Sequence, residues 1–220
     1  MKVIFTIYND VIDKKVSIYQ SMVVEKFKGD IEFISVYHEY SDEKISHGDT
    51  LNIWVNKLFL DTKYDCILIL DIDCIPLSSD SINTTFNLAY EGNLVGNIQR
   101  SNHIKNNKHV YVAPSFMCLS KDIYKKLGRP SFSTTSDGDA GEQLTYNAEM
   151  LGIPTIMYMP KHTELFPTDK KWDLADGMPS YGIGTTFEYL GMDMSYHLFE
   201  SRYRIYNKMF FNKCHQIVCH

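Results

Sequence analysis

The chain lacks both an excess of positive charge and a long apolar run. Its 220 residues hold 22 Lys and Arg against 27 Asp and Glu, so the formal net charge is −5. Such a balance argues against general binding of nucleic acids or anionic membranes. The apolar stretch Cys66–Leu70 stops at Asp71, whereas a membrane span needs roughly 20 apolar residues. We therefore expect no transmembrane segment.

The two common glycine-rich phosphate-binding motifs are also missing. Neither Gly-x-Gly-x-x-Gly nor Gly-x-x-x-x-Gly-Lys-Ser/Thr occurs, which argues against dinucleotide-binding and P-loop proteins. The apolar start at residues 2–8 is too short for a secretory signal, and the cysteines number five. We therefore expect reduced thiols and a cytoplasmic location. The ligand-type residues of the tail, Cys214 to His220, form only one cluster, whereas a structural zinc usually needs two separated pairs.

What remains is the composition of a folded globular protein, 44% hydrophobic and 22% charged. Through the first half, apolar runs alternate with amphipathic repeats, which predicts an α/β fold with a mostly parallel sheet flanked by helices. In the second half, the pattern predicts an irregular segment over residues 161–189 and a final helix over 196–211. The strands expected in the first half span residues 2–8, 31–37 and 66–72, and the helices span 13–27 and 46–60.

The sharpest signal is the sequence Ile67-Leu68-Ile69-Leu70-Asp71-Ile72-Asp73. A central strand here delivers two carboxylates at its carboxyl end, where ligands bind in open α/β sheets. Side chains alternate along a strand, so Asp71 and Asp73 share one side. Two adjacent carboxylates repel each other unless a cation lies between them, and Mn²⁺ or Mg²⁺ suits carboxylate and phosphate oxygens. The simpler interpretation is that both aspartates only end the strand in water.

This stretch, in this position, resembles the Asp-x-Asp motif of GT-A glycosyltransferases. The resemblance implies a GT-A-like (Rossmann-like) single domain, with a nucleotide-sugar-binding half at residues 1–100 and a smaller, mixed acceptor-binding half at 101–220. It implies that Asp73 binds the metal and that Asp71 contacts the metal or the donor. It also implies a nucleoside diphosphate sugar as the donor, UDP-sugar first, and an acceptor that is a glycan, a lipid-linked saccharide, a protein or a modified nucleic-acid base.

Further donor-side residues follow from the same resemblance. The first strand ends at Tyr8 and Asn9, where the family holds the nucleobase and ribose. His47 lies where a polar side chain often meets the donor. Near the end of the chain, a late histidine often completes the metal shell, which implies His197 as a ligand. Arg202 is then placed to meet the diphosphate, although a lone histidine is commonly structural.

The acceptor side is predicted at Ser136-Asp137-Gly138-Asp139-Ala140-Gly141-Glu142-Gln143. The family places a carboxylate at such a helix start, and an inverting reaction needs a base for the acceptor hydroxyl. Asp139 is the first candidate and Glu142 the second. Capping of the helix alone would also explain both residues.

Two other functions remain open at this stage. A haloacid dehalogenase-like phosphohydrolase also has a hydrophobic strand ending in Asp-x-Asp, with Asp71 as the nucleophile and Asp73 as the acid/base. Against it, about 65 residues precede the motif, and Pro76 follows closely. A catalytically silent sugar-nucleotide-binding protein would keep the site and lack turnover.

Overall fold

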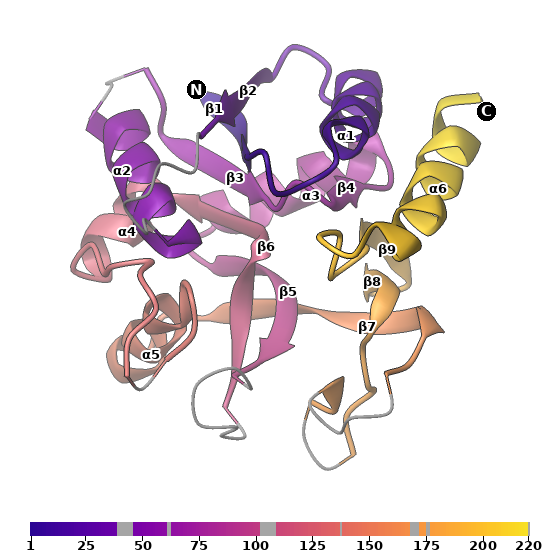
Figure 1. The fold of residues 1–220 in the computed structure, drawn as a ribbon. Coiled ribbons are helices and arrows are strands. Elements are labelled where there is room, and N and C mark those ends of the chain that lie inside the picture. The colour runs from indigo at the N-terminus through magenta and orange to yellow at the C-terminus, as the bar shows by residue number, and fades with distance from the viewer. Residues whose placement is uncertain are drawn as a thin grey trace.

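The computed structural model describes residues 1–38, 46–60, 63–101, 109–136, 138–167, 172–174 and 177–219. Helices and strands alternate as far as β3, and the two 11-residue strands, β6 and β7, lie in the second half (Figure 1). The elements are β1 (Lys2–Tyr8), α1 (Lys14–Phe27), β2 (Glu32–Tyr37), α2 (His47–Leu60), β3 (Cys66–Leu70), β4 (Cys74–Pro76), α3 (Ser79–Tyr90), β5 (Leu94–Arg100), β6 (Val110–Ser120), α4 (Lys121–Lys126), α5 (Glu142–Leu151), β7 (Thr155–Leu165), β8 (Ile183–Tyr189), β9 (Met192–His197), a short 3-10 helix η2 (Arg204–Tyr206) and α6 (Asn207–Cys219).

The strands form one curled, mixed sheet in the order β2-β1-β3-β6-β5-β7-β8-β9-β4. Among the strand pairs of the described residues, β1–β2, β1–β3 and β5–β7 are parallel, and the other five are antiparallel. The sheet is therefore mixed rather than mostly parallel as expected. The α/β class is correct, and strands from both halves of the chain share the sheet. The division into a donor half and an acceptor half concerns ligands and stays a prediction.

Two expectations for the second half are wrong. The stretch expected to be irregular contains the end of β7 and all of β8, which pair with each other. The expected helix at 196–211 begins instead as the end of β9, where Tyr196 pairs with Ile75 of β4, and α6 starts only at Asn207. In both cases the strand is fixed by a partner distant in sequence, which overrides the local pattern.

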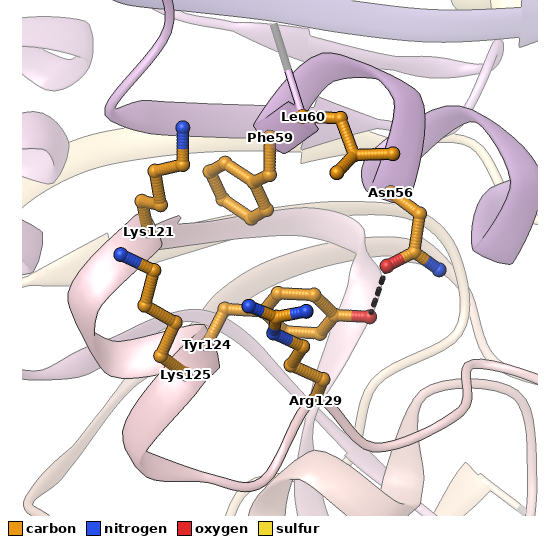
Figure 2. A pocket seen from close by; sticks show the side chains of 7 residues that line it. All are labelled: Asn56, Phe59, Leu60, Lys121, Tyr124, Lys125 and Arg129. Atoms are coloured by element: carbon orange, nitrogen blue, oxygen red, sulfur yellow. Dashed lines mark hydrogen bonds between the residues drawn. The ribbon is translucent and has the colours of Figure 1, made fainter. Parts of the chain in front are cut away.

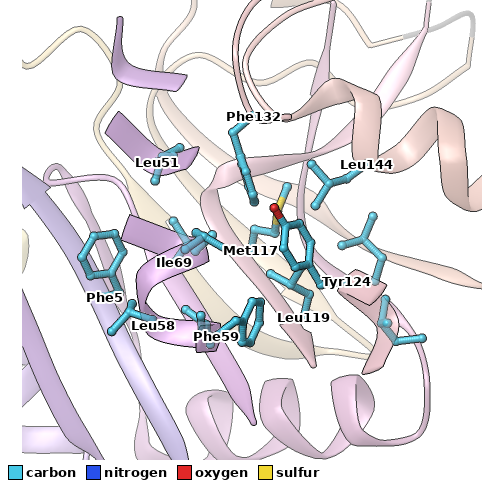
Figure 3. Close-up of a cluster of buried hydrophobic side chains, with 14 of the residues drawn as sticks. Phe5, Leu51, Leu58, Phe59, Ile69, Met117, Leu119, Tyr124, Phe132 and Leu144 are labelled. Carbon is cyan, nitrogen blue, oxygen red and sulfur yellow. The ribbon is translucent and has the colours of Figure 1, made fainter. Parts of the chain in front are cut away.

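Helices cover both faces of the sheet. In β3, Ile67 and Ile69 pack in the cluster of α2, α4 and α5, whereas Leu68 and Leu70 pack in that of α3. This alternation buries every residue of β3. Figure 3 shows the first cluster, with side chains of α2 and α4 against the strands. A third cluster joins α1 to α6, which lie side by side on the right of Figure 1.

The curl of the sheet positions the Asp-x-Asp segment. β3 is the third strand in the order and β4 the ninth, yet only residues 71–73 separate them in the chain. The last strands must therefore return to the carboxyl end of β3. In the part of the chain that the structure describes, no helix has the length and apolarity needed to cross a bilayer.

Candidate metal and donor site

The Asp-x-Asp segment is a tight link held by backbone contacts. The Asp71 N–H donates to the carbonyl of Ser115 on β6, and the Cys74 N–H donates to the carbonyl of Asp71, both at 3.0 Å. Behind the link, the buried Gln20 amide donates to the carbonyls of Asp71 (2.6 Å) and Cys74 (2.7 Å). These bonds satisfy the buried carbonyls and fix where the two carboxylates start.

His197 of β9 joins the two aspartates. Its Nε2 lies 3.1 Å from Asp73 Oδ1 and 3.9 Å from Asp71 Oδ2. β9 carries it there because His197 is paired with Cys74 in the antiparallel β4–β9 ladder. One potential ligand atom from each of the three residues lies within 4.8 Å of the other two. The structure thus brings together the three residues that the sequence predicted as metal ligands.

Asp73 and Asp71 differ in exposure and charge environment. The Asp73 side chain is 9% exposed and that of Asp71 28%. Burial alone would raise the pKa of Asp73. The charge and hydrogen bond of His197 and the hydrogen bond from the Ser201 N–H outweigh this effect, so the pKa of Asp73 lies below its usual value. The buried carboxylate is therefore ionised at neutral pH, as a metal ligand must be.

The donor set fits a divalent cation. Two carboxylates and one imidazole nitrogen converge, and Mn²⁺ accepts both ligand types, whereas Mg²⁺ favours oxygen alone. The other ring nitrogen of His197, Nδ1, is buried and has no hydrogen-bond partner among the described residues. The imidazole therefore turns only its Nε2 toward the carboxylates.

His47 approaches Asp71 from the first turn of α2. Its Nε2 lies 3.1 Å from Asp71 Oδ1. A reciprocal cap starts the helix at this residue: the Asp49 N–H donates to Ser46 Oγ, and the Ser46 N–H donates to Asp49 Oδ2. Burial opposes the charged ring, but the hydrogen bond and charge of Asp71, with charges of Asp73 and Asp139, raise the pKa of His47. The nearby carboxylates therefore favour the protonated form of His47.

Tyr8 and Asn9 lie at the same edge of the sheet. In the parallel β1–β3 ladder, Thr6 pairs with Leu70. Tyr8 lies two residues after Thr6, and Asp71 directly follows Leu70. The Tyr8 ring packs on that of Tyr37, with centroids 5.5 Å apart. The Asn9 side chain accepts a hydrogen bond from a neighbouring N–H in the turn after β1. Both predicted donor residues are thus placed near the aspartates.

Arg202 follows β9 in a turn with unusual backbone geometry. Phe199 and Glu200 both have positive φ, 55° and 54°, a conformation that costs energy in residues other than glycine. The turn brings the Ser201 N–H to 3.4 Å from Asp73 Oδ2. The Arg202 side chain is 58% exposed and donates from Nε to Glu200 at 2.7 Å. The Arg202 guanidinium therefore lies near water, and its charge interacts with that of Asp73.

Asp139 and Glu142 have different surroundings. Glu142 is fully buried, and it accepts hydrogen bonds from Ser101 Oγ (2.6 Å) and the Asp139 N–H (2.7 Å), with His109 Nδ1 at 2.6 Å. Asp139 is half-buried, accepts from the Tyr111 hydroxyl at 3.1 Å, and its charge reaches His47. Of the two candidate bases, Asp139 is the one on the side of the aspartates. Asp137 of the predicted stretch lies outside the described residues.

Several supporting residues were not predicted from the sequence. Gln20 is a polar residue on the apolar face of α1, four positions after Val16, and that place in the helical repeat was the available signal. Tyr111, which donates to Asp139, carries no such signal, because the pairing crosses from β6 to the loop before α5. In the tail, Cys214 is buried and Cys219 Sγ lies 3.6 Å from the His215 ring, while His220 lies outside the described residues.

Comparisons with known proteins give neighbours of low similarity. No family model and no curated protein matches the chain. Among solved structures, it is similar to A197 from STIV, with 16% identity, a TM-score of 0.45, and coverage of 71% of this chain and 82% of that chain.

Two further solved structures have similar scores. One is the catalytic domain of Drosophila beta1,4-galactosyltransferase 7 in complex with xylobiose, with 13% identity, a TM-score of 0.46, and coverage of 71% of this chain and 63% of that chain. The other is 4-diphosphocytidyl-2C-methyl-D-erythritol synthase, with 13% identity, a TM-score of 0.41, and coverage of 71% and 89%. The chain thus spans less than two thirds of the galactosyltransferase domain.

Proposed function

We propose that this protein is a metal-dependent glycosyltransferase that moves a sugar from a nucleoside diphosphate sugar, UDP-sugar first, to an acceptor hydroxyl. The observation that carries the proposal is the convergence of Asp71, Asp73 and His197 within 4.8 Å. The first two residues lie in the link that follows a central buried strand, and the third comes from a strand more than 120 residues later. A histidine that is 4% exposed and faces two carboxylates is better explained by a shared cation than by solvation.

Asp71, Asp73 and His197 would hold the cation. Asp73 and His197 are buried and fixed by the β4–β9 ladder, so they form the rigid part of the ligand set. Asp71 is more exposed and lies on the side from which a donor diphosphate can approach. When bound, Mn²⁺ would offset the negative charge that grows on the leaving diphosphate.

The donor would lie along the carboxyl edge of β1 and β3. Tyr8 offers an aromatic face for the nucleobase, and Asn9 lies beside it at the start of the next turn. The aspartates favour the charged form of His47, and the Arg202 guanidinium interacts with the charge of Asp73. Arg202 would exchange its Glu200 partner for diphosphate oxygens, which accept its planar donors well.

Asp139 would act as the base for the acceptor. Its carboxylate takes the proton of the acceptor hydroxyl, whose oxygen forms a bond to the anomeric carbon. The bond from that carbon to the diphosphate oxygen breaks, and the nucleoside diphosphate leaves with the electron pair. Glu142 would position the base, because it binds the Asp139 N–H from a fully buried site.

Calorimetric titration tests the donor part of the proposal. UDP, GDP and CMP are titrated into the protein with and without Mn²⁺, and into the Asp73→Asn variant. We expect UDP to bind only with Mn²⁺ and the variant to lose this dependence. Asp193→Asn is the matched control, because Asp193 of β9 is another aspartate, but it is exposed and paired with Lys161.

Three outcomes would overturn the proposal. If Asp73→Asn keeps the Mn²⁺-dependent affinity, the metal assignment is wrong. If no nucleotide binds and p-nitrophenyl phosphate is hydrolysed instead, the phosphohydrolase becomes the better assignment, with Asp71 as the nucleophile. Nucleotide binding without transfer to any acceptor would identify a silent binder.

A further inference from the structure

A second pocket lies at the far end of α2, away from the Asp-x-Asp segment. Figure 2 shows it between the last turn of α2, the short helix α4 and the segment that follows α4. Its volume is about 160 Å³. Among the residues that the structure describes, seven line it: Asn56, Phe59, Leu60, Lys121, Tyr124, Lys125 and Arg129.

Two aromatic rings and the exposed Leu60 form the apolar part of this α2–α4 pocket. Phe59 is 6% exposed and Tyr124 2% exposed, and their ring centroids are 5.3 Å apart. The Tyr124 hydroxyl donates to Asn56 Oδ1 at 3.4 Å, a contact drawn in Figure 2. A cavity of roughly 150 Å³ accepts benzene in another protein, so this pocket has room for one ring.

Three cations surround the same pocket. Lys121, Lys125 and Arg129 line it, and none of the seven lining residues is acidic. Within the described part of the chain, Lys125 has a contact at 4.0 Å with Asp122, and neither Lys121 nor Arg129 forms a salt bridge. Three like charges around one small volume repel each other.

We propose that the α2–α4 pocket binds a phosphate monoester that carries an aromatic ring. The ring would lie against Phe59 and Tyr124, and the phosphate dianion would lie among the three cations. Arg129 offers paired donors that match phosphate oxygens, and the two lysines add point charges. A dianion is favoured over a carboxylate because it neutralises two of the three charges.

This pocket is separate from the donor site. Asn56 is nine residues after His47 on the same helix, which corresponds to roughly 14 Å along the axis. None of its lining residues belongs to the set that holds the metal or the donor. Binding here therefore requires neither Mn²⁺ nor Asp73, and the two proposals can fail independently.

Binding is measured by calorimetry in buffer with EDTA and no added metal. The probes are phenyl phosphate, inorganic phosphate, phenol and benzoate. We expect phenyl phosphate to bind roughly tenfold more tightly than any of the other three, because only it has both the ring and the dianion. The proposal is overturned if phenyl phosphate does not bind, or if inorganic phosphate binds equally well.

Variants locate the bound probe. Lys121→Gln and Arg129→Gln should each weaken phenyl phosphate binding roughly tenfold, the effect of losing one charge-assisted contact. Lys126→Gln, on the exposed side of α4, and Asp73→Asn should leave it unchanged. An unchanged melting temperature for each variant shows that the fold is intact. Equal binding by the Lys121 and Arg129 variants would place the probe elsewhere and reject the pocket.

Discussion

The Nε2 atom of His197 lies 3.1 Å from Oδ1 of Asp73, although 124 residues separate the two in the sequence. The contact depends on the curl of the sheet, because β9 and β4 must return to the end of β3. It also gives Asp73 a lowered pKa despite its burial. Two structural facts, the curl and the charge, therefore support the same proposed ligand set.

Removing the imidazole tests whether His197 is a ligand. We expect His197→Asn to weaken Mn²⁺-dependent UDP binding by at least roughly tenfold, since even outer partners of metal ligands are worth about 10–100-fold. Calorimetric titration measures the change. His162→Asn, at an exposed position of β7, should bind like the wild type. Wild-type affinity in His197→Asn would mean that the histidine is structural.

Asp139 and Glu142 are distinguished by kinetics. Asp139→Asn should lower kcat by roughly 10²–10⁴-fold, the usual contribution of a general base, and should leave the affinity for UDP and Mn²⁺ intact. Steady-state transfer to an acceptor measures kcat, and calorimetry measures the affinity. Unchanged kcat in Asp139→Asn would remove this residue from the proposed mechanism.

Glu142→Gln should affect stability more than chemistry. The carboxylate is fully buried and accepts from the Ser101 hydroxyl and the Asp139 N–H. Glutamine replaces one carboxylate oxygen by an NH2 group, which cannot accept these hydrogen bonds. We expect the free energy of unfolding to fall by about 1–3 kcal/mol, measured by urea denaturation. A stability equal to that of the wild type, with kcat abolished, would instead make Glu142 the catalytic group.

The strand that carries Asp71 and Asp73 could be predicted because its signal is local. A continuous apolar run followed by carboxylates needs no partner to be recognised, and the run is buried on both faces. The position of His197 could be predicted only through resemblance, and its element was wrong. The ladder between β4 and β9 depends on residues distant in sequence, which periodicity along one segment cannot report.

The supporting contacts of the site were less predictable. The partners of Glu142 are the residue after β5, the residue before β6 and a residue of the loop that precedes α5. The expectation that Glu142 caps its helix or serves as a base did not include a buried cluster with Ser101 and His109. Such clusters depend on how the strands are ordered, and the antiparallel place of β6 in the sheet was not expected.

The pair of His109 and Glu142 predicts a pH dependence of stability. Burial alone would raise the pKa of Glu142. Hydrogen bonds from His109 and Ser101 outweigh this effect, so the pKa of Glu142 lies below its usual value. Burial alone would lower the pKa of His109. The hydrogen bond and charge of Glu142 and the charge of Glu149 outweigh this effect, so the pKa of His109 lies above its usual value. The ion pair therefore weakens at low pH, where Glu142 takes up a proton, and at high pH, where His109 loses one.

The sign for each group follows from linkage. The stabilisation from Glu142 is present above its unfolded pKa of about 4.3 and is lost as the pH falls through the folded value. That from His109 is present below about 6.5 and is lost as the pH rises through the folded value. We expect the difference in unfolding free energy between wild type and Glu142→Gln to be largest between about pH 4.5 and 6.5. Urea denaturation from pH 4 to 9 measures it, and a constant difference contradicts the pairing.

Two glycines separate the effect of backbone conformation from that of packing. Gly141 has φ +76°, and a Cβ there would lie 2.7 Å from Pro114 Cγ; Gly152 has φ +64° and no heavy atom within 4 Å of such a Cβ. Alanine at either position costs about 1–2 kcal/mol for the left-handed conformation. Gly141→Ala should lose a further amount of about 1–3 kcal/mol from overpacking, and the shift of the neighbouring Asp139 should lower kcat. Urea denaturation measures the loss of unfolding free energy in both variants. Equal losses would show that Pro114 moves aside without cost, and that β6 does not hold the loop of Asp139 in place.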